Sequence, residues 1–175
     1  CQAWAQAPAE RAALSGELST RSGNPVLRLF GAEIKERGFA HGYLLAGKIL
    51  ESLDSAVTSL PMFTTEKYES KLLPWAKSSF HWDADSSDEL AGIFEGMTAR
   101  LGKDQVRSKI LKRTLALDDL YAINTVGDYF GPACSGFTAW KARTQGGQVI
   151  HGRNLDFPLG KEAVANQVIL ASAAL

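Results

Sequence analysis

Two short segments, separated by a glycine-rich turn, carry side chains that could perform chemistry together. The first segment, residues 134–142, begins with Cys134 and is rich in small and aromatic residues. A turn follows at residues 145–147, where two glycines tolerate the positive φ angles that tight hairpins demand. A hairpin would place Cys134 close to the end of the returning strand, which holds Arg153 and Asp156.

The types of these side chains indicate nucleophilic catalysis. A guanidinium near a thiol favours the reactive thiolate over the thiol, whose free pKa is ~8.5. A nearby carboxylate can orient an amine or take part in proton transfer. Residues three apart on a regular strand face opposite sides, so Arg153 and Asp156 can both reach Cys134 only if the strand ends or bulges between them. Pro158 and Gly160 predict such an ending.

The same residues resemble a known family. The resemblance is carried by residues 134–140 (Cys-Ser-Gly-Phe-Thr-Ala-Trp) and 151–156 (His-Gly-Arg-Asn-Leu-Asp). Together they look like the C45-type peptidases, relatives of acyl-coenzyme A:isopenicillin N acyltransferase. The second run also resembles bile salt hydrolases and penicillin V acylases, and all of these are N-terminal-nucleophile (Ntn) hydrolases. Residues 36–45 and 117–124 are similar to the propeptide side of the C45 group, so the resemblance covers roughly residues 23–170.

The resemblance implies a self-processing cysteine enzyme. The precursor would cut itself between Ala133 and Cys134, although many relatives have glycine before the nucleophile. The freed α-amino group, with an ordinary pKa of ~7.7–8.0, would act as the base for the Cys134 thiol, which attacks an amide carbonyl. Asp156 matches the carboxylate held against that amine, and Arg153 matches the arginine of the bile salt hydrolases. Asn154 could donate a hydrogen bond to a substrate carbonyl.

Three functions follow as hypotheses. The first is an amidohydrolase that cleaves a non-peptide or small-peptide C–N amide bond. The second is an acyltransferase that uses an acyl thioester donor, because water and an amine compete for the same acyl-enzyme. The third is a non-catalytic exported helical domain or lipoprotein fragment. We expect no metal or other cofactor, because no set of His and Cys residues has metal-ligand spacing.

Before the hairpin, the pattern of apolar residues predicts helices. A helix over residues 33–60 has apolar residues every fourth position and ends at Pro61. A second is predicted around residues 68–76, kinked or shortened by Pro74. The capping box Ser86-x-x-Glu89 predicts the start of a third, and Asp118 that of a fourth. The expected apolar face of the third helix comprises Leu90, Ile93, Phe94, Met97 and Leu101.

The predicted fold class is α+β. We expect a leader or linker over residues 1–22, a helical propeptide-like part over 23–133, and the start of an Ntn αββα sandwich over 134–175. The last range is too short to form two stacked sheets. We therefore expect a truncated fold whose partner is a missing C-terminal part of the same enzyme, and this segment alone to be inactive.

Composition and charge bear on the class of protein, its partners and its location. Hydrophobic residues make up 45% of the 175 residues and charged residues 22%, which is typical of a globular protein. The net charge of zero does not favour nucleic acid as a partner, and no apolar run is long enough to span a membrane. Export is predicted by the small-x-small motif of residues 5–7 or by Cys1 as the acylated residue of a lipoprotein; an arbitrary fragment start is the alternative.

Overall fold

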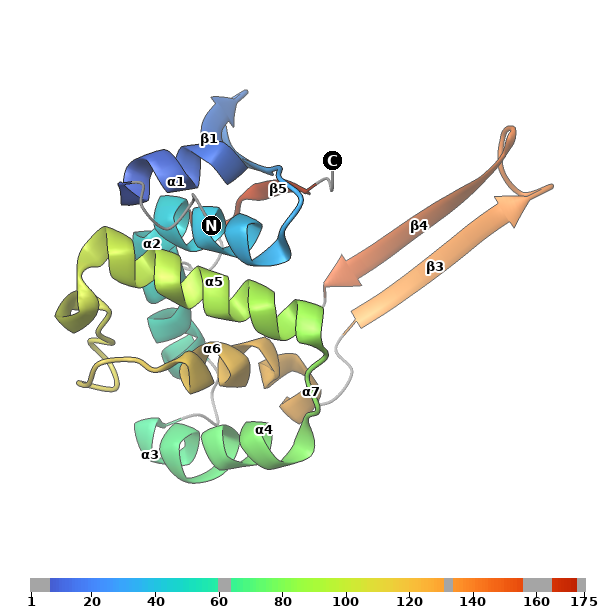
Figure 1. Ribbon diagram of the computed structural model, residues 1–175. Helices are drawn as coiled ribbons and strands as arrows, with labels where there is room; N and C mark the ends of the chain where they lie inside the picture. The colour runs from blue at the N-terminus through green and yellow to red at the C-terminus, as the bar shows by residue number, and fades with distance from the viewer. Residues whose placement is uncertain (1–6, 60–63, 131–133, 156–164, 173–175) are drawn as a thin grey trace.

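The computed structural model describes residues 7–59, 64–130, 134–155 and 165–172. Figure 1 shows a body of helices with a small sheet at one end, and a long two-stranded hairpin that extends away from this body. The class is therefore α+β, as the sequence predicts.

The elements of the body follow one another in this order: α1 (Pro8–Ser15), β1 (Gly16–Arg21), β2 (Asn24–Leu29), α2 (Ile34–Ser59), α3 (Thr65–Lys67), the π-helical turn η2 (Tyr68–Leu72), α4 (Leu73–Ser79), α5 (Ala84–Leu101), the short 3-10 turn η3 (Lys103–Gln105), α6 (Leu117–Asn124) and α7 (Val126–Phe130). The remaining strands are β3 (Cys134–Lys141), β4 (Gly147–Leu155) and β5 (Ile169–Ser172). Strand β2 pairs antiparallel with β1 and parallel with β5, while β3 pairs antiparallel with β4.

Helix α2 is the central element of the body and contributes to two apolar cores. Its first part packs Phe39, with neighbouring apolar residues, against α1 and β2. Its last part packs Leu53 and Val57 against α4, α5 and α6. The helix bends between the two parts at Leu45, whose φ and ψ are −114° and 15°. The predicted apolar face of α5 is confirmed for Leu90, Ile93 and Met97, which are buried.

Helices α2 and α5 cross with their backbones in direct contact. The crossing is built on Gly38 and Gly42 in α2 and on Gly92 and Gly96 in α5. A Cβ atom added at Gly42 would lie 1.9 Å from the Ile93 carbonyl oxygen. One added at Gly92 would lie 2.2 Å from the carbonyl oxygen of Lys35. Residues four apart lie on one face of a helix, and two such small-residue pairs let the helices approach more closely than any side chain would allow.

Residues 8–21, which the sequence pattern assigned to a leader or linker, form α1 and β1. Arg11 of α1 is only 5% exposed. Its guanidinium donates to both carboxylate oxygens of Glu36 at 2.9 Å and to Glu95 Oε1 at 2.5 Å. It also lies over the Phe39 ring, 3.8 Å from the ring centroid. Burial alone would lower the pKa of Arg11, but the two carboxylates outweigh it and raise the pKa, so Arg11 stays charged and joins α1 to α2 and α5.

We expect Arg11→Lys to lower the free energy of unfolding by about 1–2 kcal/mol, because an ammonium keeps the charge but cannot form the bidentate fork. The measurement is urea unfolding followed by circular dichroism. Arg28→Lys is the control, since Arg28 is exposed on β2 and should tolerate the change. Equal stability of the wild type and Arg11→Lys would contradict the role of the fork.

Two helix starts differ from those predicted. Helix α5 begins at Ala84, because Asp83 caps it by accepting from the Ser86 N–H at 2.9 Å. The predicted start at Ser86 is therefore wrong by about one turn. Helix α6 begins at Leu117 rather than after a capping Asp118. Its first turn is held by the next carboxylate, that of Asp119, which accepts from the Ala116 N–H at 2.7 Å.

Candidate functional site

The candidate site is the hairpin of β3 and β4. Its turn contains Gly146 and Gly147, both with φ of 72°, so the predicted glycine turn is confirmed. Helices α6 and α7 lead to the start of β3, and the hairpin extends from this side of the helical body (Figure 1). The sequence therefore predicted both strands and their connection.

The strand register decides which positions of the hairpin share a face. Thr138 lies opposite His151, with Thr138 Oγ1 and His151 Nδ1 2.8 Å apart, so these two residues are on one face. Cys134 lies opposite Leu155, and Arg153 lies opposite Gly136. Because strand residues alternate between faces, positions 134 and 153 have the same parity as the Thr138–His151 pair. They are diagonal neighbours on one face, a relation that sheet geometry places about 7–8 Å apart.

The strand register does not bring every predicted site residue to the face of position 134. Asn154 lies opposite Ser135, so its position has the opposite parity and the register does not bring it to the face of position 134. Strand β4 is described as far as Leu155, and whether the chain bends between Arg153 and Asp156, as a shared site requires, falls outside the described residues. Ala133 and Asp156 themselves lie outside the described residues, and of Cys134, Arg153 and Asn154 the structure describes the backbone alone.

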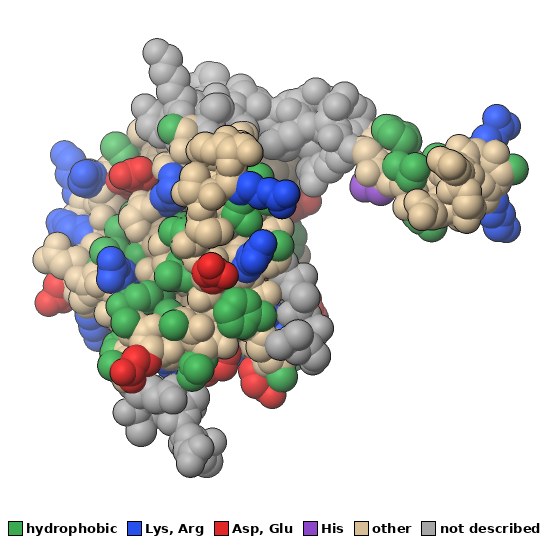
Figure 2. All heavy atoms as spheres, turned by 90° about the horizontal axis from the view of Figure 1, so that it is seen from above, with side chains coloured by type: hydrophobic (Ala, Val, Ile, Leu, Met, Phe, Trp, Pro, Cys, Tyr) green, Lys and Arg blue, Asp and Glu red, His purple; other side chains and the backbone are tan. Residues whose placement is uncertain are grey.

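One face of the hairpin carries exposed apolar side chains. Phe137 and Ile150, 62% and 48% exposed, lie on the face opposite to that of Thr138 and His151. Val149, 73% exposed, lies where the strand register shifts between Ala139 and Lys141. Figure 2 shows hydrophobic side chains along this arm and basic ones at its far end. An exposed apolar strand face is typical of a sheet that packs on another layer, and an isolated two-stranded hairpin is only marginally stable in water.

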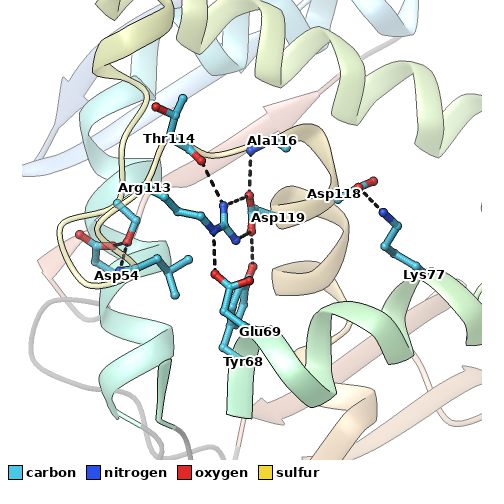
Figure 3. A network of polar contacts seen from close by, with 11 residues as sticks. Asp54, Tyr68, Glu69, Lys77, Arg113, Thr114, Ala116, Asp118 and Asp119 are labelled. Carbon is cyan, nitrogen blue, oxygen red and sulfur yellow. Dashed lines mark hydrogen bonds and ion pairs between the residues drawn. The ribbon is translucent and has the colours of Figure 1, made fainter. Parts of the chain in front are cut away.

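A cluster of charged residues in the helical body has a structural role. Figure 3 shows Arg113 between Asp119 and Glu69. Its guanidinium donates to both oxygens of the Asp119 carboxylate, at 2.7 and 2.8 Å, and to Glu69 at 2.6 Å. The Tyr68 hydroxyl donates to Asp119 at 2.9 Å. Asp119 is 1% exposed, and each of its oxygens accepts two hydrogen bonds, which leaves no free group for a substrate.

Protonation states in this cluster follow from its geometry. Burial alone would raise the pKa of Asp119, but the bonds from Arg113, Ala116 and Tyr68 outweigh it and lower the pKa. Burial, together with the carboxylate of Asp119, raises the pKa of Tyr68, which therefore remains a donor. The hydrogen bond to Asp119 likewise raises the pKa of Arg113. The cluster is thus a fixed ion pair with a neutral phenol.

The described residues define an α+β chain in which a helical body is followed by a β-hairpin with a cysteine at the start of its first strand. No family model, curated protein or solved structure matches this chain. No helix within the described ranges is long and apolar enough to cross a membrane. The case for a function therefore rests on the chain's own residues.

Proposed function

We propose that this chain carries the nucleophile-bearing hairpin of a self-processing cysteine amidohydrolase of the Ntn class, related to the C45-type peptidases. The observation that carries the proposal is the register of β3 and β4. It puts position 134 at the start of one strand and position 153 diagonally across from it on the same face. A guanidinium at such a position favours the thiolate of a cysteine.

The proposed chemistry begins with hydrolysis of the peptide bond between Ala133 and Cys134, in which water leaves a carboxyl group on Ala133 and a free α-amino group on Cys134. The new α-amino group takes the proton from the Cys134 thiol, and the thiolate attacks the carbonyl carbon of an amide substrate. The C–N bond breaks, the leaving amine takes the proton, and an acyl thioester remains on the sulfur. Water then hydrolyses the thioester, releasing a carboxylic acid and restoring the thiol. Asp156 would hold the α-amino group in place.

The exposed apolar face of the hairpin supports the same proposal. Phe137 and Ile150 lie on the face opposite to that of positions 134 and 153, and both are exposed in the described residues. In an αββα sandwich, such a face would be covered by the neighbouring layer. The face of positions 134 and 153 carries the polar pair Thr138 and His151 and would be the side of the site.

The test is intact-mass spectrometry of the purified full-length precursor, because we expect this segment alone to be inactive. We expect the wild type to separate into two pieces, the second beginning at Cys134, and Cys134→Ala to remain uncut. Cys1→Ala is the matched control, because it removes the other cysteine and should leave scission unchanged. An uncut wild type would contradict self-processing and would favour a non-catalytic helical domain. If scission occurs, the ratio of acid to new amide formed from a thioester donor and an amine distinguishes hydrolase from acyltransferase.

A further inference from the structure

A cavity of about 320 Å³ lies where helices α2, α5 and α6 meet, apart from the hairpin. Most of its wall is apolar, and includes one isoleucine from each of the three helices: Ile49, Ile93 and Ile123. Trp82, from the loop before α5, adds an aromatic ring, while His41 and Glu89 add polar groups. An apolar hollow with a few convergent polar groups is typical of small-molecule sites.

An unpaired nitrogen of His41 is the first observation that indicates a ligand in this cavity. Its Nδ1 atom is buried and has no hydrogen-bond partner among the described residues. Burial lowers the pKa of His41, so the imidazole is neutral and one of its ring nitrogens can accept a hydrogen bond. His41 lies in α2 between Gly38 and Gly42, where the backbones of α2 and α5 touch, and its side chain lines the cavity. An unsatisfied buried polar atom is costly, and a ligand group that bonds to it removes that cost.

The charge of the cavity decides which ligand fits. Glu89 supplies a carboxylate, and the described residues that line the cavity include no Lys or Arg. Asn124 donates its Nδ2 to the Leu120 carbonyl at 2.8 Å, which leaves its amide oxygen as an acceptor. Trp82 offers a ring to a cation. These groups are acceptors or electron-rich faces, and together they favour a ligand that carries positive charge and hydrogen-bond donors.

We propose that this cavity binds a small organic amine, in which a primary ammonium group is joined to a compact apolar body. The ammonium has three donors, which match the Glu89 carboxylate, the His41 ring nitrogen and the Asn124 amide oxygen. The apolar body packs against the isoleucines and against Leu120. A carboxylate-bearing ligand such as a fatty acid is disfavoured, because it would be repelled by Glu89. This inference does not depend on Cys134 or on scission.

The experiment is a titration of the full chain with 2-phenylethylammonium, followed by the methyl NMR signals of its isoleucines. We expect saturable shifts at Ile49, Ile93 and Ile123, with a Kd on the order of 1 mM, the strength usual for a ligand of this size. The methyl groups of Ile110 and Ile150 serve as internal controls, because neither residue lines this cavity. 2-Phenylethanol, which has the same body without the charge, should bind about tenfold more weakly.

Two matched variants separate the cavity from general charge effects. Glu89→Gln keeps the size of the side chain and should weaken binding about tenfold, since hydrogen bonds to charged groups are the strong ones. Asp88→Asn removes the same charge one residue away, outside the cavity lining, and should leave the Kd within about twofold. Urea unfolding of both variants confirms that the fold is intact. Absence of saturable shifts, equal affinity for the alcohol, or an unchanged Kd in Glu89→Gln would each overturn the proposal.

Discussion

Replacing Asp119 with asparagine is expected to lower the free energy of unfolding by about 3–5 kcal/mol, the range measured when one partner of a buried ion pair is removed. The change leaves the Arg113 guanidinium beside a neutral amide, whose NH₂ group faces donors at one of the two oxygen positions. It also weakens the bonds that Asp119 accepts from the Tyr68 hydroxyl and the Ala116 N–H. Urea unfolding at pH 7, monitored by circular dichroism, measures the loss.

The neighbouring carboxylate provides the control. Asp118 accepts from Lys77 at 2.6 Å, but these two side chains are 44% and 56% exposed. Exposed ion pairs contribute about 0–1 kcal/mol, so Asp118→Asn should have a small effect. The same chemical change at adjacent positions thus tests burial and hydrogen bonding alone. Comparable losses in the two variants would contradict the structural role of Asp119.

Stability should also depend on pH through Asp119. Its pKa is lower in the folded protein than in the unfolded chain, where it is ~3.9, so the carboxylate stabilises the fold fully above the unfolded value. This contribution is lost as the pH falls through the folded pKa. The stability difference between wild type and Asp119→Asn should therefore be constant from pH 6 to 7, within about 0.5 kcal/mol, and shrink below about pH 4. A difference that grew in acid would show that the sign is wrong.

Gly42→Ala is expected to destabilise the fold by about 2–3 kcal/mol, which corresponds to a fall in Tm of about 4–12 °C for a chain of this size. The added Cβ would lie 1.9 Å from the Ile93 carbonyl oxygen and 2.7 Å from its carbon, so α2 and α5 must move apart. The separation opens gaps along the whole crossing, because both helices are held by packed side chains on either side. Thermal unfolding measures the shift.

The control for this substitution, Gly47→Ala, is expected to change stability in the opposite direction. Gly47 lies in the same helix, is exposed, and has no atom within 4 Å of an added Cβ. Alanine is favoured over glycine in a helix by about 0.8–1.0 kcal/mol, so Gly47→Ala should stabilise the protein. Two identical changes five residues apart should therefore move Tm in opposite directions. A Gly42→Ala protein as stable as the wild type would show that the helices do not touch there.

Local patterns in the sequence were sufficient for much of the fold. The apolar repeat that includes Leu53 and Val57 predicted α2, because one turn of a helix brings such residues onto one face. The paired glycines at 146 and 147 predicted the turn of the hairpin, since the left-handed conformation is a property of the single residue. The start of α5 was missed by about one turn because Asp83 and Ser86 are both good caps, and a capping pattern alone does not rank them.

The tertiary structure decided what depends on residues far apart in the chain. Arg11 and Glu95 are 84 positions apart, and no spacing rule connects them, so a segment resembling a leader proved to be part of the body. Strand β5 lies within residues 134–175, the range expected to begin the Ntn sheet, yet it pairs with β2 rather than with the hairpin. The spacing of Gly38 and Gly42 is visible in the sequence, but it does not show that another helix packs there. The close contact depends on the backbone of α5 lying opposite these two glycines.

For the candidate site, too, some features could be predicted from the sequence and others depended on the tertiary structure. Sequence alone determined that a cysteine begins a strand and that an arginine lies near the end of its partner, because both follow from a turn and from alternation within one hairpin. Only the three-dimensional arrangement set the register that places positions 134 and 153 on one face and position 154 on the other. It also formed the cavity around His41, because the walls come from three helices whose packing is settled by long-range contacts rather than by neighbours in the chain.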